Sequence, residues 1–247
     1  MLNNYYSVTI PSENTLKNLV VRAKDDQIHF IDGINEISAI GKIKKFNYNC
    51  HYVVLLPAAS LFYHSAPLAE KNPYRISEDN ILSKFAEVKE NFEEEFYYDY
   101  LEIVSEKTKE REIKFFAAEK TLLDSITENL DKYKNNYFIS ALPVAVFNTV
   151  NKVVAQSNYL LYYKINSSYT MLTAVDKKLD LLQASISPAE LQSEIDKTQK
   201  YYLNNKNIKL KVLAGKSSLL NLEEFMDLED EDFVFLTSML WSIEKCQ

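Results

Sequence analysis

The order of regular elements in the second half of the chain is the feature that most limits its fold. Apolar residues alternate with polar ones over 158–165, 169–175 and 178–184, which predicts three short strands in an antiparallel meander. A helix over 188–203 and a strand over 208–213 follow. The sequence therefore predicts three meander strands, a crossing helix and a fourth strand.

The helix over 188–203 has the clearest start signal in the chain. Ser187 can cap it, Pro188 suits its first position, and Glu190 stands three residues after the cap, where its carboxylate completes a capping box. Two more helices are expected after the last strand. The first spans about 218–227, and the second carries Phe233, Leu236, Met239, Leu240 and Ile243.

The first half of the sequence predicts the same order of strands and helices as the second half, with an insertion. Strands over 5–10, 18–24 and 27–31 form a meander, and the nearly continuous apolar run over 52–56 predicts a strand that is covered on both faces. Pro143 predicts the start of a short helix. The insertion is expected to hold a strand over 61–65, a helix over 78–93, strands over 98–104 and 112–117, and a helix with Leu122, Leu123, Ile126 and Leu130.

A three-strand meander followed by a helix and a parallel fourth strand is the order of a ribonuclease-H-like unit, and two such units in tandem make the actin-like fold. We therefore predict an α/β (α+β) chain with an actin-like ATPase fold and mixed sheets. The first lobe is expected over 1–150, with the inserted β-α-β-β-α subdomain, and the second ribonuclease-H-like lobe over 151–247. A chain of 247 residues suits two packed lobes.

Glycine is scarce. Only Gly33, Gly41 and Gly215 occur, against about 17 at the average usage of about 7%. Glycine-rich turns let backbone amides approach phosphate, so P-loop, Rossmann and kinase functions are disfavoured. The segment 214–217 (AGKS) resembles the end of a Walker A loop, but Leu210 stands where its first glycine belongs. We interpret it as a strand-to-helix turn.

The net charge of −7 equals the charge of seven acids that lie close together near the C-terminus with no base among them. This balance opposes binding to nucleic acid, which selects for clustered Lys and Arg. The acids can favour the N-terminus of the last helix, or they can form a docking patch for a basic partner, and both interpretations stay open. The group consists of Glu223, Glu224, Asp227, Glu229, Asp230, Glu231 and Asp232.

Cysteine and histidine provide no recognisable site. Cys50 and Cys246 form no CxxC motif, which favours a reducing compartment and gives no zinc knuckle. Cys50 and His51 are neighbours on a strand and should face opposite ways, the cysteine buried and the histidine at the surface. His51 and His64 would meet only if their strands paired, and no third ligand is evident. We expect no catalytic residue, no metal and no cofactor.

Four segments carry a resemblance to a family. They are YVVLLPAASLFYHSAPL over 52–68, KFFAAEKTLL over 114–123, LPVAVFN over 142–148 and VLAGKSSLLNL over 212–222. In this order they resemble the cytoplasmic domain of the type II secretion L protein and its PilM-type relatives of type IV pili. The composition, rich in Asn, Lys and Tyr, is similar to that of proteins of the bundle-forming pilus system.

The resemblance implies a scaffold at the cytoplasmic face of a bacterial inner membrane. Its partners would be the N-terminal domain of the assembly ATPase and the inner-membrane platform proteins. PilM-type members bind ATP through Asp-x-Gly hairpins and a late glycine-rich turn, of which this chain keeps Gly215. Its second hairpin has Lys164, Asn166 and Ser167 instead, and its first, over 10–15, has no Asp-x-Gly. Because lysine cannot bind magnesium, we expect a degenerate nucleotide pocket without hydrolysis.

Two other functions stay open on the sequence. One is an actin-like ATPase that binds nucleotide through an altered pocket, and the other is an independent binding module with no membrane connection. No run reaches the ~18 apolar residues of a spanning helix, and no signal peptide is evident. The resemblance implies a transmembrane helix after the domain. Because 241–247 ends in a helical pattern without a glycine cap, we expect this sequence to be the cytoplasmic part of a longer protein.

Overall fold

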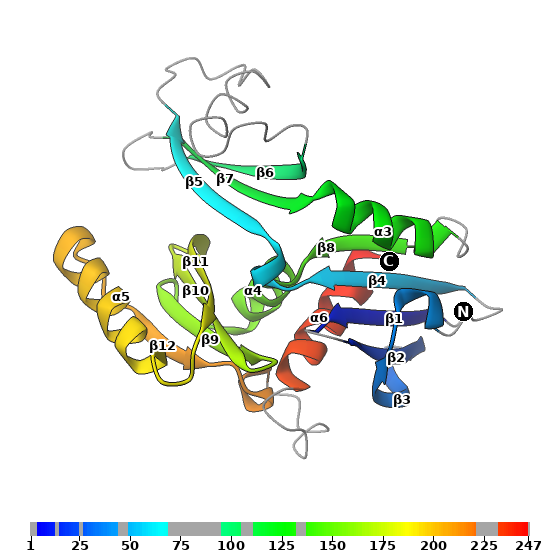
Figure 1. Ribbon diagram of the computed structural model, residues 1–247. Coiled ribbons are helices and arrows are strands. Elements are labelled where there is room, and N and C mark those ends of the chain that lie inside the picture. Colours follow the sequence, from blue (N-terminus) through cyan, green and yellow to red (C-terminus); the bar gives the residue numbers. More distant parts are fainter. Residues whose placement is uncertain are drawn as a thin grey trace. The chain divides into compact units, whose positions relative to one another are not determined.

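The computed structural model describes residues 4–12, 15–24, 27–43, 49–68, 95–104, 111–131, 137–220 and 232–246 (Figure 1). The chain divides into two compact units. The main unit comprises Met1–Ala59 and Leu130–Gln247, and the inserted unit comprises Ser60–Asn129. No helix within the described ranges is both long enough and apolar enough to cross a bilayer.

The first sheet of the main unit has five strands in the order β3-β2-β1-β4-β8. Its first three strands pair antiparallel as the predicted meander, and β4 and β8 add in parallel. The prediction missed β8, which lies at the sheet edge and has no fully buried residue, so it lacks a clear alternating pattern. The strands are β1 (Asn4–Pro11), β2 (Leu16–Lys24), β3 (Gln27–Ile37), β4 (Cys50–Leu56) and β8 (Tyr137–Ala141).

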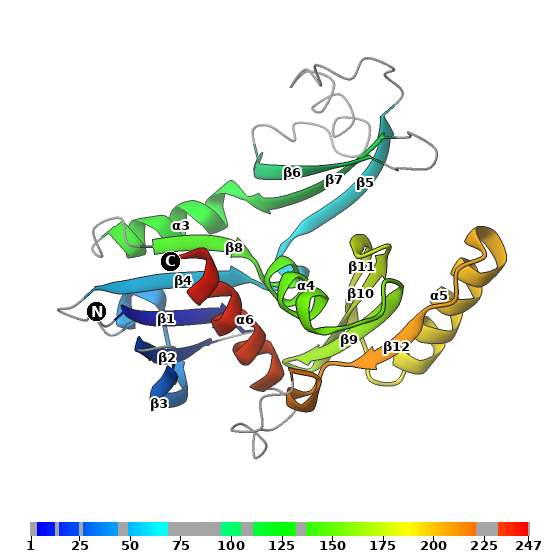
Figure 2. The same ribbon diagram turned by 180° about the vertical axis from the view of Figure 1, so that it is seen from behind.

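Two helices pack beside this sheet. Helix α4 (Leu142–Val153) begins with the predicted proline, Pro143, and is longer than expected. Helix α6 (Asp232–Lys245) is the predicted last helix, and it contacts both α4 and β1. Figure 2 shows α6 crossing this sheet. Near its C-terminal end, the Trp241 ring lies 5.5 Å from that of Phe138 on β8.

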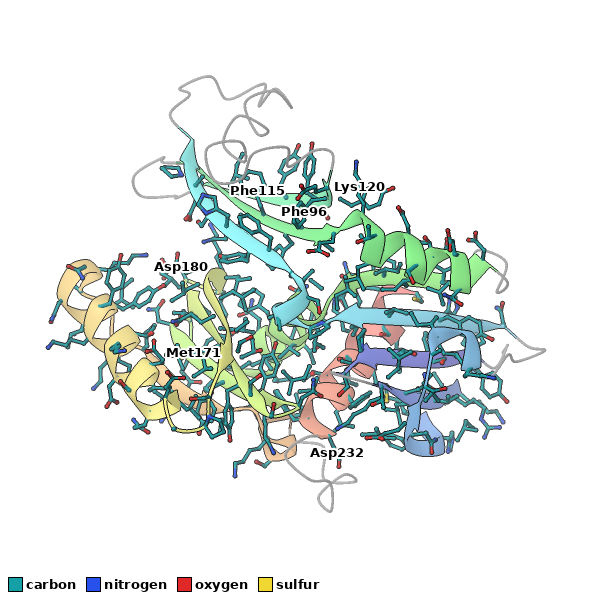
Figure 3. All side chains as sticks on the ribbon, viewed as in Figure 1. Phe96, Phe115, Lys120, Met171, Asp180 and Asp232 are labelled. Atoms are coloured by element: carbon teal, nitrogen blue, oxygen red, sulfur yellow. The ribbon has the colours of Figure 1, made fainter. Side chains whose placement is uncertain are left out.

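The second sheet of the main unit has four strands in the order β11-β10-β9-β12. Its three antiparallel strands and the parallel β12 confirm the predicted order. Helix α5 (Leu191–Lys206) packs on it through Ile195 and Tyr202, which cluster with Leu160, Met171 and Leu210 (Figure 3). The strands are β9 (Tyr159–Ile165), β10 (Ser168–Val175), β11 (Lys178–Ile186) and β12 (Lys211–Ala214).

Both ends of α5 lie three residues later than the sequence predicted. The Ser187 carbonyl accepts from the amides of Glu190 and Leu191, so the first turn is tight and the regular helix starts at Leu191. The Ser187 hydroxyl hydrogen-bonds the Glu190 carboxylate at 2.6 Å, which lowers the pKa of Glu190. At the C-terminal end of α5, Asn207 adopts the left-handed conformation and the Ile208 amide donates to the Tyr202 carbonyl. Strand β12 therefore begins at Lys211.

The inserted unit is a three-stranded antiparallel sheet in the order β5-β7-β6, followed by α3. Its core gathers Phe96 and Phe115 with Ala66, Ile113 and Ala117 (Figure 3). The predicted elements are confirmed with longer strands, except that the predicted helix over 78–93 lies outside the described residues. The elements are β5 (Phe62–Leu68), β6 (Phe96–Val104), β7 (Arg111–Glu119) and α3 (Lys120–Leu130).

Three short 3₁₀ turns complete the described elements: η1 (Ile40–Lys42), η2 (Ala58–Ser60) and η4 (Ser217–Leu220). The helix predicted over 218–227 therefore begins as the 3₁₀ turn η4, and its remainder lies outside the described residues. In η4, the Leu219 amide donates to the Lys216 carbonyl at 2.9 Å. This i to i+3 bond accounts for the tighter turn.

The neighbours Cys50 and His51 face opposite sides of β4. Cys50 is 1% exposed, which confirms the buried cysteine, and burial raises the pKa of its thiol to about 12. The prediction of a surface histidine is wrong, because His51 is half-buried and its ring stacks on Tyr6 at 5.3 Å. His51 and His64 are not cross-strand neighbours, since β4 pairs with β1 and β8 whereas β5 pairs with β7.

Gly215 is required by close packing. A Cβ built there would lie 2.6 Å from the Cβ of Tyr163 and 2.7 Å from Cε1 of Phe233. We expect Gly215→Ala to lower the free energy of unfolding by about 1–3 kcal/mol, because overpacking forces these neighbours apart. Urea denaturation of the intact chain measures the loss.

The matched control is Gly33→Ala on edge strand β3, where an added Cβ meets nothing within 4 Å. Both substitutions restrict the unfolded chain equally, so the difference between them isolates the steric effect. Equal stabilities of the two variants would contradict the packing role of Gly215.

His51 gives the stability a pH dependence. Burial lowers the pKa of His51 in the folded chain, whereas the pKa of a histidine in an unfolded chain is about 6.5. Between these two values the unfolded chain binds more protons, so the free energy of unfolding falls as the pH falls below about 6.5. We expect His51→Gln to reduce this slope, as measured by urea denaturation at several pH values between about 7 and about 5.

His29→Gln, on β3, is the matched substitution. It leaves the stacked His51 in place, so comparing the two variants shows whether the slope depends on this ring or on the loss of any histidine. An unchanged slope in His51→Gln would show that other groups cause the acid sensitivity.

Candidate functional site

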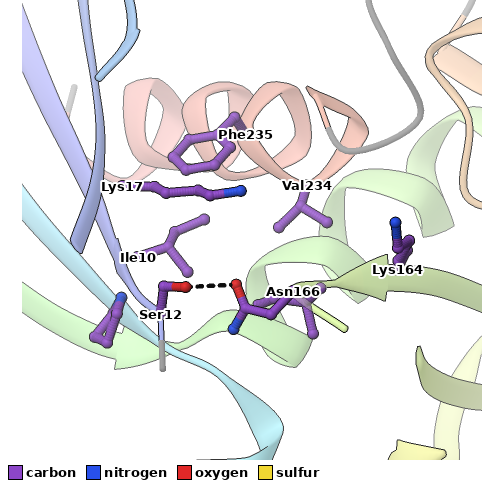
Figure 4. Close-up of a pocket in the computed structure, with 9 residues that line it drawn as sticks. Ile10, Ser12, Lys17, Lys164, Asn166, Val234 and Phe235 are labelled. Atoms are coloured by element: carbon purple, nitrogen blue, oxygen red, sulfur yellow. Dashed lines mark hydrogen bonds between the residues drawn. The ribbon is translucent and has the colours of Figure 1, made fainter. Parts of the chain in front are cut away.

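Two hairpins of the main unit face one another beside α6 (Figure 4). One joins β1 to β2 and belongs to the first sheet; the other joins β9 to β10 and belongs to the second. Between them lies a cavity of about 20 Å³. The residues that line it are Ile10, Pro11, Ser12, Lys17, Lys164, Ile165, Asn166, Val234 and Phe235.

The second hairpin is tight because of Asn166. Ile165 pairs directly with Ser168, so the loop has two residues, and Asn166 is left-handed with φ 55°. Asparagine is one of the few residues besides glycine that adopt this conformation readily. The turn thus keeps a glycine-like backbone while it presents an amide side chain to the cavity.

The first hairpin meets this amide with a hydroxyl. Pro11 ends β1 opposite Leu16, and the Ser12 amide donates to the Thr15 carbonyl at 2.8 Å. The Ser12 hydroxyl then donates to Oδ1 of Asn166 at 2.8 Å, the bond drawn in Figure 4. One side-chain hydrogen bond therefore joins two hairpins whose residues are 154 positions apart.

The cavity does not fit a magnesium nucleotide. About 20 Å³ is room for about one water molecule. Among the described residues that line it, Lys17 and Lys164 carry charge and none is acidic. Magnesium is held in proteins by carboxylates together with phosphate oxygens. The lining residues supply neither the volume nor the carboxylate.

The structure brings together part of the predicted nucleotide pocket. Lys164 and Asn166 line the cavity, whereas Ser167 and Gly215 are not among its lining residues. Gly215 follows β12, packs against Tyr163 and Phe233, and donates its amide to the Tyr162 carbonyl at 2.7 Å. Because Gly215 has no side chain, the Phe233 ring can pack beside it. This packing explains why a glycine stands here without invoking a bound phosphate.

Sequence reasoning missed Ser12 and Lys17 as residues of this site. Ser12 lies in the first hairpin, which the sequence located correctly, and Lys17 follows on β2. Only their position in the chain could have indicated them, because in two tandem lobes the equivalent hairpins are expected to face one another. The side chains themselves match no motif.

Most of the predicted acidic patch lies outside the described residues. Its last member, Asp232, is described and is the first residue of α6 (Figure 3). A carboxylate there interacts favourably with the positive end of the helix dipole. Within the described ranges no group of three or more His, Cys, Asp or Glu side chains could hold a metal ion.

Neither a protein-family model nor a curated protein matches this sequence. Solved structures do resemble its fold. The cytoplasmic domain of EpsL, an inner-membrane component of the type II secretion system of Vibrio cholerae, superposes with a TM-score of 0.64 at 12% identity, covering 97% of this chain and 95% of that one.

Two further structures agree. A structure of the PilM-PilN type IV pilus biogenesis complex matches with a TM-score of 0.66 at 11% identity, over 94% of this chain and 96% of that one. A Bacteroides thetaiotaomicron protein described as having an actin-like ATPase fold and unknown function gives 0.57 at 9%, over 96% and 95%. At these identities the likeness concerns the fold, and the chain has the actin-like fold.

Proposed function

We propose that this protein is a non-catalytic scaffold of a type II secretion or type IV pilus inner-membrane platform. The observation that carries the proposal is the likeness over almost the whole chain to the cytoplasmic domain of EpsL and to the PilM-PilN complex. Fold alone does not fix function. The proposal therefore also rests on the chemistry of the cavity.

The cavity between the hairpins favours a scaffold over an ATPase. Its residues offer two lysines and a closed Ser12–Asn166 hydrogen bond where a nucleotide would need space and a magnesium ligand. A scaffold acts through contacts with other proteins and needs no bound nucleotide. A domain without hydrolysis is therefore consistent with a place in such a platform.

The proposed location is the cytoplasmic face of the inner membrane. The proposed partners are the N-terminal domain of the assembly ATPase and the inner-membrane platform proteins. The acidic run that ends at Asp232 gives the chain a localised negative field, which suits a basic surface on a partner. Membership of the bundle-forming pilus system stays a prediction from composition.

The lobe division is part of the same proposal. We propose a first lobe over 1–150, with the insertion, and a second over 151–247. Helix α6 then belongs to the second lobe by sequence while it packs against β1 of the first. In this division each lobe contributes one of the two hairpins that line the cavity.

An actin-like ATPase with a degenerate pocket is the second candidate. The observation in its favour is that the two hairpins, one from each sheet, do face one another around a cavity. An altered pocket of this kind would have to open before it could admit a nucleotide.

Titration calorimetry with ATP and magnesium separates the two candidates. We expect no binding tighter than about 1 mM, a free energy of about −4 kcal/mol, because the cavity is small and its described lining residues include no carboxylate. The matched variant Lys17→Ala/Lys164→Ala tests any heat that is measured, since binding in the cavity would be lost with its charge. Micromolar binding with phosphate release would overturn the scaffold function.

Capture of the N-terminal domain of the assembly ATPase tests the partner. We expect the intact chain to bind it at low ionic strength and to bind more weakly as salt screens the acidic run. The variant Glu229→Gln/Asp230→Asn/Glu231→Gln should weaken binding about three- to tenfold, measured by biolayer interferometry, because it removes three charges from the run.

The control removes the same three charges elsewhere. Glu36→Gln/Asp196→Asn/Glu128→Gln changes exposed residues of β3, α5 and α3 and should leave the affinity unchanged. Equal losses in both triple variants would reject the acidic run as the docking patch. Absence of capture at low ionic strength would reject this partner.

A further inference from the structure

The two sheets of the main unit are joined in two different ways. Away from the cavity they are joined by helix packing: α6 contacts β1 and β9, and the Thr149 hydroxyl of α4 donates to the Thr237 carbonyl of α6 at 3.0 Å. At the cavity the hairpins are joined by the hydrogen bond from Ser12 to Asn166. The first connection is broad and largely apolar, whereas the second includes a polar contact between two side chains.

The backbone at each partner of this hydrogen bond is held by its own hairpin. Ser12 is held by its amide bond to the Thr15 carbonyl, and Asn166 is held by the two-residue turn with φ 55°. The bond therefore costs little backbone freedom to form. It is also part-buried, so water competes for it less than at an open surface.

The neighbours of the bond leave little room for anything else. Ile10, Val234 and Phe235 form an apolar wall beside it, and the remaining space of about 20 Å³ takes about one water molecule. A ligand that held the hairpins together would have to break the bond and enlarge this space. The protein already supplies the connection from its own side chains.

We propose that Ser12 and Asn166 form a latch that holds the two sheets together at the hairpins without any ligand. The latch couples the hairpins: opening either one exposes the other. This inference does not depend on which partner the protein binds. The latch can therefore be wrong while the scaffold function is right, and the scaffold function can be wrong while the latch is right.

Hydrogen exchange on the intact chain tests the latch. The variants are Ser12→Ala and Asn166→Gly, the latter chosen because glycine adopts φ 55° without strain. Loss of one hydrogen bond should raise exchange about two- to tenfold. The decisive readout is the opposite hairpin: Ser12→Ala should raise exchange over 162–170, and Asn166→Gly should raise it over 8–12 and 15–17.

The double variant Ser12→Ala/Asn166→Gly completes a double-mutant cycle. It should exchange no faster than the faster single variant, because each substitution alone already breaks the same bond. Ser12→Thr keeps the hydroxyl donor and should keep wild-type exchange in both hairpins. If each single variant affects its own hairpin alone, or if the two effects multiply in the double variant, the latch is rejected.

Two controls test whether the effect is specific to this bond and independent of ligand. Ser187→Ala breaks a comparable serine side-chain bond at the start of α5 and should leave both hairpins unchanged. Magnesium and ATP, each at about 1 mM, should not slow hairpin exchange in the wild type. If they do slow it, a ligand closes the hairpins and the ligand-independent latch is wrong.

Discussion

The burial of helix α6 is the constraint on which the main unit depends. Its residues Phe233, Leu236 and Met239 are almost fully buried, and its polar residues Thr237 and Ser238 are buried as well, with their hydroxyls donating to carbonyls one turn earlier. A helix with so little exposed surface needs neighbours on most sides. It finds them in helix α4 and in β1 and β9, one strand from each sheet.

This burial explains the sequence around the last strand. Phe233 lies beside the Tyr163 ring of β9, and the chain passes them at Gly215, where even a methyl group would collide. The resemblance to PilM-type proteins places this glycine in a degenerate nucleotide pocket. The packing gives it another cause, since the space where a side chain would begin at this position is occupied by the Phe233 ring.

The sequence predicted what local patterning controls and missed what tertiary contacts control. Period-two alternation located both meanders, and the pair Ser187 and Glu190 located α5 to within three residues. Strand β8 was missed because an edge strand with no fully buried residue has no alternation to detect. The partners of His51 and His64 depend on which strands pair, and the Ser12–Asn166 bond spans 154 positions, so neither was available from local pattern.

The cavity shows that the two hairpins of an actin-like fold can face one another with no carboxylate among the described residues that line the space between them. The geometry that brings two hairpins together comes from the sheets and from α6, which are held by apolar packing. In the proposed latch, the bond between Ser12 and Asn166 holds the hairpins together without a bound phosphate.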